Sequence, residues 1–176
     1  MKYREIKRCS DLKVSEIALG CEGFMEKTAL ECRAMFDRAL ELGINFIDMY
    51  SPNPDFRDSI GKAIAGRRER FVLQGHIGSV WENGQYLRTR ELTKVREAFE
   101  DQLCRLGTEY LDIGMIHYVD SDDDFATVFS GPFRAYCQEL KDCGKIRCLG
   151  ISSHNPVIAR KAVETGLIDV LMFSVN

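Results

Sequence analysis

The chain has 176 residues, of which 45% are hydrophobic and 29% are charged, a balance typical of globular rather than disordered proteins. Its 24 basic and 27 acidic side chains leave a net charge of −3, which gives no electrostatic reason to expect nucleic acid or an anionic membrane as a partner. No apolar run reaches the roughly 18 residues of a membrane span, and the charged N-terminus MKYREIKRCS lacks a signal-peptide core, so we expect one cytoplasmic domain over residues 1–176.

The cysteines point to the same compartment. Their number, seven, is odd, and no two of them have the C-x-x-C spacing of zinc sites or redox motifs. Most lie in apolar segments, where a thiol packs as a small hydrophobic group. We therefore expect reduced cysteines at Cys9, Cys21, Cys32, Cys104, Cys137, Cys143 and Cys148.

Strand and helix patterns alternate along the chain. Residues 2–17 predict two short strands around a polar turn at Ser10 and Asp11. Short apolar runs predict six further strands, at residues 17–20, 44–50, 71–78, 111–118, 146–153 and 169–175. Helical spacing of apolar residues, with glycine or asparagine at several ends, predicts five helices, at residues 28–42, 59–65, 89–106, 133–143 and 156–164.

This alternation predicts an α/β fold with a parallel sheet covered by helices. A doubly wound sheet and a (β/α)8 TIM barrel both fit it. The glycine-rich phosphate-binding motifs G-x-G-x-x-G and G-x-x-x-x-G-K-[ST] are absent from the sequence, which weakens the dinucleotide-fold and nucleotide-hydrolase readings. Four strands end instead in polar, reactive residues: Asp48, His76, His117 and Ser152. Such residues at successive strand ends favour a barrel enzyme.

The length is short for a complete barrel. Eight strands and eight helices usually take about 250 residues, whereas six and five are visible after the N-terminal hairpin. The chain also stops at Asn176, directly after an apolar strand. We therefore expect a partial barrel, truncated at its C-terminus, whose open edge offers a surface for self-association.

Four segments, in order, resemble the aldo-keto reductase family: YREIKRCSDLKVSEIALG, ELGINFIDMY, YLDIGMIHYVD and GKIRCLGISSHNP. The match runs from Tyr3 to Asn176 and covers the N-terminal two-thirds of that family's barrel. The resemblance implies an oxidoreductase that reduces a small aldehyde or ketone with NADPH. In that family a tyrosine donates a proton to the carbonyl oxygen, a lysine and an aspartate tune the tyrosine, and a histidine orients the carbonyl.

The catalytic positions match in part. The resemblance assigns the aspartate to Asp48 and the histidine to His117. His76 stands where the family has its lysine, and is either a substitute whose charge depends on pH or a merely polar strand end. The tyrosine is usually five residues after the aspartate, where this chain has Asn53. Tyr50, two residues after Asp48 and on the same side of a regular strand, takes the role of proton donor if a local deletion has shortened the segment.

The resemblance also implies a cofactor site. It assigns Ser152 to the nicotinamide carboxamide, with Ser153 beside it in place of the usual asparagine, although both also read as neighbours of a helix cap. It assigns Gly20 and Cys21 to the floor of the cofactor pocket. Because the adenosine phosphate site of the family lies mainly in the last two βα units, we expect this chain to bind NADP(H) weakly or not at all. An iron–sulfur cluster, found in some relatives, would require a further C-terminal region.

Some features leave alternatives open. The altered lysine and tyrosine positions also suit a reductase-like barrel without catalysis, acting as a subunit or regulatory module. The acidic residues 120–124 lack the pattern of a calcium loop and predict a solvated loop with helix-start chemistry. The basic residues 67–70 predict an exposed turn. Trp81 and Tyr86 either line the substrate mouth or simply flank the turn signal at Asn83 and Gly84.

Overall fold

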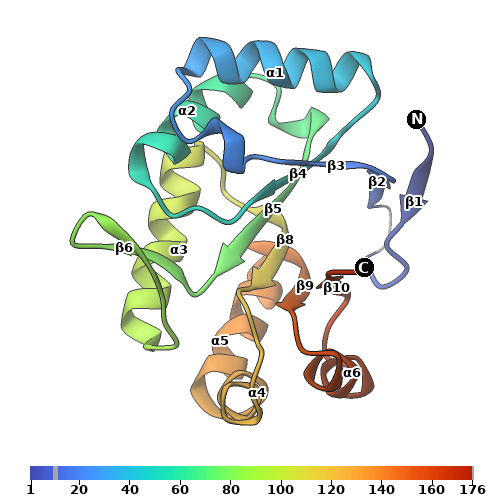
Figure 1. Ribbon diagram of the computed structural model, residues 1–176, viewed down its shortest axis with the longest axis vertical. Helices are drawn as coiled ribbons and strands as arrows, with labels where there is room; N and C mark the ends of the chain where they lie inside the picture. The colour runs from blue at the N-terminus through green and yellow to red at the C-terminus, as the bar shows by residue number, and fades with distance from the viewer. Residues whose placement is uncertain (10–11, 176) are drawn as a thin grey trace.

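The sheet is the element that organises this molecule, a computed structural model that describes residues 1–9 and 12–175. Its six parallel strands are Ala18–Gly20 (β3), Phe46–Met49 (β4), Val72–Ile77 (β5), Leu111–Ile116 (β8), Ile146–Ser153 (β9) and Val170–Phe173 (β10). They lie side by side in chain order and form a curled, open sheet (Figure 1). Because the order never reverses, the fold is an incomplete (β/α)8 barrel, as predicted, and not a doubly wound sheet.

The helices cover the outer face of the sheet. They are Ala29–Glu41 (α1), Pro54–Ile64 (α2), Leu92–Leu106 (α3), Asp122–Phe129 (α4), Gly131–Asp142 (α5) and Pro156–Glu164 (α6), with short 3-10 turns at Glu22–Phe24 (η1) and Arg68–Arg70 (η2). They follow one another around the sheet from α1 at the top of Figure 1, past α3 at the left, to α6 at the lower right. Within the described ranges, no helix is both long and apolar enough to cross a membrane.

Two helices differ from the prediction, and local capping explains both. The helix-start chemistry expected of the acidic residues 120–124 is present, but residues 122–124 belong to α4 and not to a loop, because Ser121 caps this helix by accepting a hydrogen bond from the backbone N–H of Asp124. Helix α2 begins five residues before the predicted start, because Asn53 caps it and Pro54 occupies its first position. The prediction of five helices is therefore short by one.

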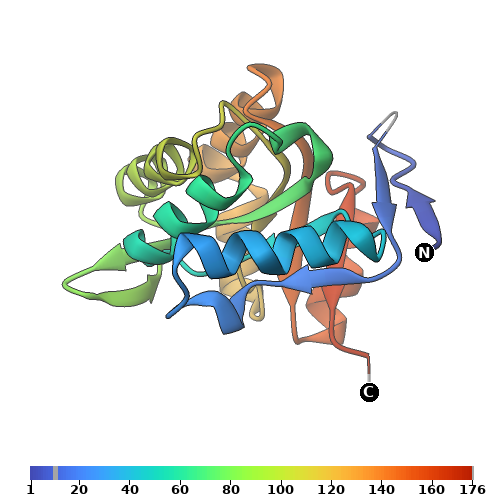
Figure 2. The same cartoon turned by 90° about the horizontal axis from the view of Figure 1, so that it is seen from above.

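Two antiparallel hairpins extend beyond the sheet at opposite ends of the molecule (Figures 1 and 2). The first consists of Tyr3–Glu5 (β1) and Lys13–Ser15 (β2), and the turn predicted at Ser10 and Asp11 lies outside the described residues. The second consists of Ser79–Glu82 (β6) and Gln85–Arg88 (β7), which follow β5. Asn83 and Gly84 join its strands with positive φ angles of 52° and 79°, the backbone of a two-residue hairpin turn.

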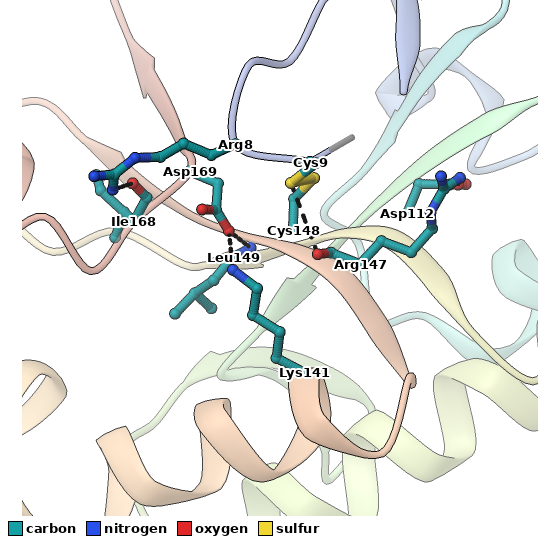
Figure 3. Close-up of a disulfide and its surroundings, with 9 residues drawn as sticks. All are labelled: Arg8, Cys9, Asp112, Lys141, Arg147, Cys148, Leu149, Ile168 and Asp169. Carbon is teal, nitrogen blue, oxygen red and sulfur yellow. Dashed lines mark hydrogen bonds and ion pairs between the residues drawn. A yellow bond between two sulfur atoms is a disulfide. The ribbon is translucent and has the colours of Figure 1, made fainter. Parts of the chain in front are cut away.

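The N-terminal hairpin closes the amino end of the sheet. Cys9 lies against β9, where its sulfur is bonded to that of Cys148, and the two Cα atoms are 5.9 Å apart (Figure 3). The expectation that all cysteines are reduced is therefore wrong for this pair, because the fold brings together residues 139 positions apart in the sequence. The other five cysteines are free. A small apolar cluster surrounds the pair: Leu12, Val14, Val72, Ile113 and Met115.

The basic residues 67–70 are only partly the exposed turn that was predicted, because Arg70 is exposed but Arg67 is buried and Arg68 is half-buried. Arg67 is only 8% exposed and its guanidinium pairs with Asp37 of α1. Arg68 Nη2 donates to Asp112 Oδ2 on β8 at 2.8 Å, and Arg147 Nη1 lies 3.0 Å from the other oxygen of the same carboxylate. These arginines turn back over the protein because the carboxylates of Asp37 and Asp112 and nearby backbone carbonyls satisfy their donors.

Candidate active site

The carboxyl end of the sheet gathers the predicted reactive residues. Asp48 lies in β4, His76 in β5, His117 directly after β8, and Ser152 and Ser153 at the end of β9. All five line one cavity of about 210 Å³. The cavity forms here because the carboxyl ends of parallel strands meet at one edge of a curled sheet.

A chain of hydrogen bonds joins the three central residues. His76 Nε2 lies 3.0 Å from Asp48 Oδ1, and His76 Nδ1 lies 2.7 Å from His117 Nδ1. Gln74 on the same strand as His76 donates to Asp48 Oδ1 at 2.7 Å. The imidazoles of His76 and His117 are almost fully buried, at 4% and 1% exposure.

Burial and hydrogen bonding fix the charges of these groups. Burial raises the pKa of Asp48, but hydrogen bonds and charge from His76, with a further bond from Gln74, outweigh it and hold the pKa below the ordinary value. Burial, followed by the nearby charge of His76, lowers the pKa of His117 to about 3. At neutral pH, Asp48 is therefore a carboxylate and His117 is a neutral imidazole.

Tyr50 lies at this cavity but its hydroxyl is engaged elsewhere. Its ring is parallel to that of His117, with centroids 5.9 Å apart, while its hydroxyl donates to Glu22 Oε1 at 3.0 Å. Burial, with that hydrogen bond, raises the pKa of Tyr50 to about 12. Asn53, at the position where the family has tyrosine, accepts a hydrogen bond from the N–H of Phe56 as a helix cap.

A second tyrosine reaches the site from the β6–β7 hairpin. Tyr86 Oη lies 2.8 Å from His117 Nε2, the ring nitrogen that His76 does not use. The sequence shows the turn at Asn83 and Gly84 and suggests Tyr86 as part of the substrate mouth, but it does not show this contact. Tyr86 also lines a second cavity of about 480 Å³, which adjoins the first through His117 and Tyr50.

Tyr118 holds His117 from the other side. Its backbone adopts a φ of 47°, in the left-handed region that is unusual for a bulky residue, and its ring stacks on His117 with centroids 4.1 Å apart. Arg90 Nη2 donates to the carbonyl oxygens of both His117 and Tyr118, at 2.6 and 2.9 Å. Asp124 of α4 in turn binds Arg90 Nε at 2.7 Å. The strained turn is thus fixed by a half-buried arginine.

A sequence model of the aldo/keto reductase family matches residues 16–176. The chain belongs to this family. It is 31% identical to the "uncharacterized oxidoreductase YqkF" of Bacillus subtilis over 93% of its own length, and 30% identical to the "NADH-specific methylglyoxal reductase" of Escherichia coli over 92%. It spans about half of these relatives, 53% and 55%. The holo form of the aldo-keto reductase AKR11C1 of Bacillus halodurans has a TM-score of 0.82 and 31% identity, over 99% of this chain and 58% of that one.

The cofactor residues expected in this aldo-keto reductase divide into two groups. Ser152 and Ser153 line the smaller cavity, but Ser152 Oγ accepts from the N–H of Tyr118 at 3.0 Å, and Ser153 Oγ donates to Asp120 Oδ1 at 3.1 Å. Gly20 and Cys21 are not among the described residues that line either cavity. The backbone N–H of Cys21 donates to the carbonyl of Asp48 at 3.0 Å, and burial raises the pKa of its thiol.

Metal ligands do not gather at this site. Within residues 1–9 and 12–175, no group of three or more histidine, cysteine, aspartate or glutamate side chains has the arrangement of a metal site. The polar chemistry of the cavity is that of hydrogen-bonded imidazoles, phenols and one carboxylate.

Proposed function

We propose that this member of the aldo-keto reductase family reduces a small aldehyde or ketone to an alcohol with NADPH. The observation that carries the proposal is the hydrogen-bonded row of Asp48, His76 and His117 at the carboxyl end of the barrel strands. Catalytic groups of barrel enzymes occupy this end of the sheet. The family and its oxidoreductase members support the reaction class.

The smaller cavity suits the nicotinamide end of such a cofactor. Its 210 Å³ is less than the space usual for a drug-sized ligand, so it admits one ring rather than a whole dinucleotide. Phe173 and Met172 of β10 add apolar surface to its lining. The Ser152 hydroxyl accepts one hydrogen bond within the protein and keeps a second lone pair that a carboxamide N–H can use. When bound, a reduced nicotinamide supplies a hydride to the carbonyl carbon.

His117 is the residue best placed to act on the carbonyl oxygen. It lines both cavities, so a carbonyl held between the nicotinamide pocket and the larger cavity lies against its ring. Tyr50 and Tyr86 flank the same ring and are the two phenols that can give a proton to a developing alkoxide, but Tyr50 can do so only after its hydroxyl leaves Glu22. Asp48 accepts a hydrogen bond from His76, which in turn contacts His117 Nδ1, so these two residues fix the orientation of the His117 ring toward the substrate oxygen.

The larger cavity defines the class of substrate. Its 480 Å³ fits a small molecule, and its lining combines the apolar Met25 and Trp81 with the acidic Glu22 and Glu26. These carboxylates favour neutral carbonyl compounds over anionic ones. A relative named as a methylglyoxal reductase acts on a molecule of that kind, and its NADH specificity makes NADH the second cofactor to test.

The decisive experiment measures carbonyl-dependent oxidation of NADPH and NADH by the natural full-length polypeptide. Asp48→Asn is expected to lower kcat/KM by roughly 10²-fold or more, because it removes the charge behind the histidines. Asp123→Asn makes the same change at an exposed carboxylate of α4 and is expected to have no effect. Failure of the wild type to oxidise either cofactor with any of a panel of small aldehydes and ketones would refute the proposal and favour a non-catalytic binding module.

A further inference from the structure

We propose that Tyr86 is the catalytic proton donor of this enzyme, and that Asp48, His76 and His117 form a relay that returns a proton to it. The inference rests on the proposed carbonyl reduction and assigns a further residue to it. Four side chains from three different strands and the β6–β7 hairpin form one unbroken line of hydrogen bonds. The distances along it are 3.0 Å from Asp48 to His76, 2.7 Å from His76 to His117 and 2.8 Å from His117 to Tyr86.

When both histidines are neutral, the donor and acceptor at every contact of this line are fixed by which atoms carry protons, and all the hydrogen bonds point from Tyr86 toward Asp48. Asp48, as a carboxylate, can only accept, so the proton on His76 lies on Nε2. His76 Nδ1 then accepts, and the proton on His117 lies on Nδ1. His117 Nε2 therefore accepts as well, and Tyr86 donates its hydroxyl proton to it. Every donor meets an acceptor, with none left over.

A proton taken up by this line of hydrogen bonds gives His76 a second proton and reverses the bonds from His76 to His117 and from His117 to Tyr86. His76 then donates from both nitrogens, to Asp48 and to His117 Nδ1. The Nδ1 proton of His117 passes to His76 Nδ1, the hydroxyl proton of Tyr86 passes to His117 Nε2, and Tyr86 takes a proton from solvent, so that His117 Nε2 now donates to Tyr86 Oη. The hydroxyl proton of Tyr86 is now free to point at a substrate. The added positive charge lies on His76 because its Nε2 contacts the Asp48 carboxylate, whereas the ring nitrogens of His117 contact only another imidazole and a phenol.

The proton transfers then balance. Hydride from a reduced nicotinamide forms the new C–H bond, and the electron pair of the carbonyl double bond moves to oxygen. That oxygen forms an O–H bond with the hydroxyl proton of Tyr86, because an alkoxide is a much stronger base than a phenolate. Tyr86 takes a proton from His117 Nε2, and His117 Nδ1 takes one from His76. Neutral His76 still donates to Asp48, and after the alcohol leaves Tyr86 takes up one solvent proton, which restores the charged state through His117.

Tyr50 is less suited to this role. Its hydroxyl proton is already donated to Glu22, and no hydrogen bond joins Tyr50 to either histidine among the described residues. A proton lost from Tyr50 would place a phenolate beside the Glu22 carboxylate, which is unfavourable. Its ring instead forms a wall parallel to His117.

The first test compares Tyr86→Phe with Tyr50→Phe in the natural full-length polypeptide. Each variant removes one hydroxyl from the same cavity and keeps the ring. Tyr86→Phe is expected to lower kcat by roughly 10² to 10⁴-fold with KM nearly unchanged, and Tyr50→Phe by less than roughly tenfold. Tyr136→Phe, which removes a buried hydroxyl of α5 outside the site, is the matched control and is expected to keep wild-type activity.

The second test needs no cofactor or substrate. In an ¹⁵N spectrum of the histidine side chains under mildly alkaline conditions, His117 Nε2 is expected to be unprotonated. Its resonance is expected to move toward that of a free, unprotonated nitrogen in Tyr86→Phe and to stay in place in Tyr50→Phe. A protonated Nε2 that does not respond to Tyr86→Phe would overturn the relay.

The outcomes separate the two proposals. An active wild type in which Tyr50→Phe abolishes turnover and Tyr86→Phe does not overturns the role of Tyr86 and leaves carbonyl reduction intact. A wild type without activity on any carbonyl overturns the proposed function, and the catalytic role of Tyr86 with it. Loss of turnover in Tyr86→Phe together with the shift of His117 Nε2 supports both.

Discussion

His117 is expected to make the stability of this protein depend on pH in the mildly acidic range. The pKa of its imidazole is about 3 in the folded protein, against an ordinary value of 6.5. At pH values between these two, the imidazole of His117 is protonated in the unfolded chain and neutral in the folded protein. The stabilisation is therefore complete above about pH 6.5 and is lost as the pH falls toward 3.

The size of the effect follows from the width of this window. One proton taken up only by the unfolded chain costs about 1.4 kcal/mol of stability per pH unit. Acidification from about pH 7 to about pH 4.5 then removes roughly 2.5 kcal/mol through His117 alone. The titratable rings that face this imidazole are those of His76, Tyr86, Tyr50 and Tyr118, and the charges of Arg90, Arg88 and Asp48 also act on it. The pKa of Asp48 is held below its ordinary value of 3.8, so the stability that its ionised form contributes is lost at pH values below the interval considered for His117.

Urea unfolding followed by far-ultraviolet circular dichroism at a series of pH values measures this slope. The variant His117→Gln cannot take up a proton, so its free energy of unfolding is expected to fall less steeply than that of the wild type by about one proton. Parallel profiles for the wild type and His117→Gln would refute the argument that burial keeps this histidine neutral.

Two further predictions concern packing and substrate charge. A methyl group at Gly61 of α2 would collide with the backbone carbonyl of Arg105 in α3. Gly61→Ala is therefore expected to lower the free energy of unfolding by about 1–3 kcal/mol, measured by the same urea titration. Gly23→Ala serves as the control, because a methyl group there meets open space. Because Glu26 lines the larger cavity, Glu26→Gln is expected to improve kcat/KM for a carboxylate-bearing carbonyl relative to a neutral one of the same size by roughly fivefold, and an unchanged ratio would contradict this role.

The fold was largely predictable because its signals are local. Apolar runs and glycine stops place the six strands and most helices within a few residues, and β9 and α6 have the predicted bounds. The errors arise where a helix cap determines the secondary structure or a tertiary partner determines the burial of a side chain. Ser121 turns an acidic run into α4, and Asp37 and Asp112 draw Arg67 and Arg68 out of solvent. The two aspartates lie about 30 or more positions from their arginines in the sequence, so no local pattern can predict these contacts.

The site residues likewise include some that a local sequence pattern predicts and one that it does not. Asp48, His76 and His117 are predictable because each ends a strand, and parallel strand ends converge. Tyr86 is not, because its contact depends on how far a hairpin folds back over the barrel mouth. The departure of His76 from the family lysine nevertheless carries information. A lysine can hold a proton beside a tyrosine directly, whereas the shorter imidazole reaches only a second imidazole. A phenol on the far side of that second ring is then the group in line to receive the proton, and Tyr86 occupies that place.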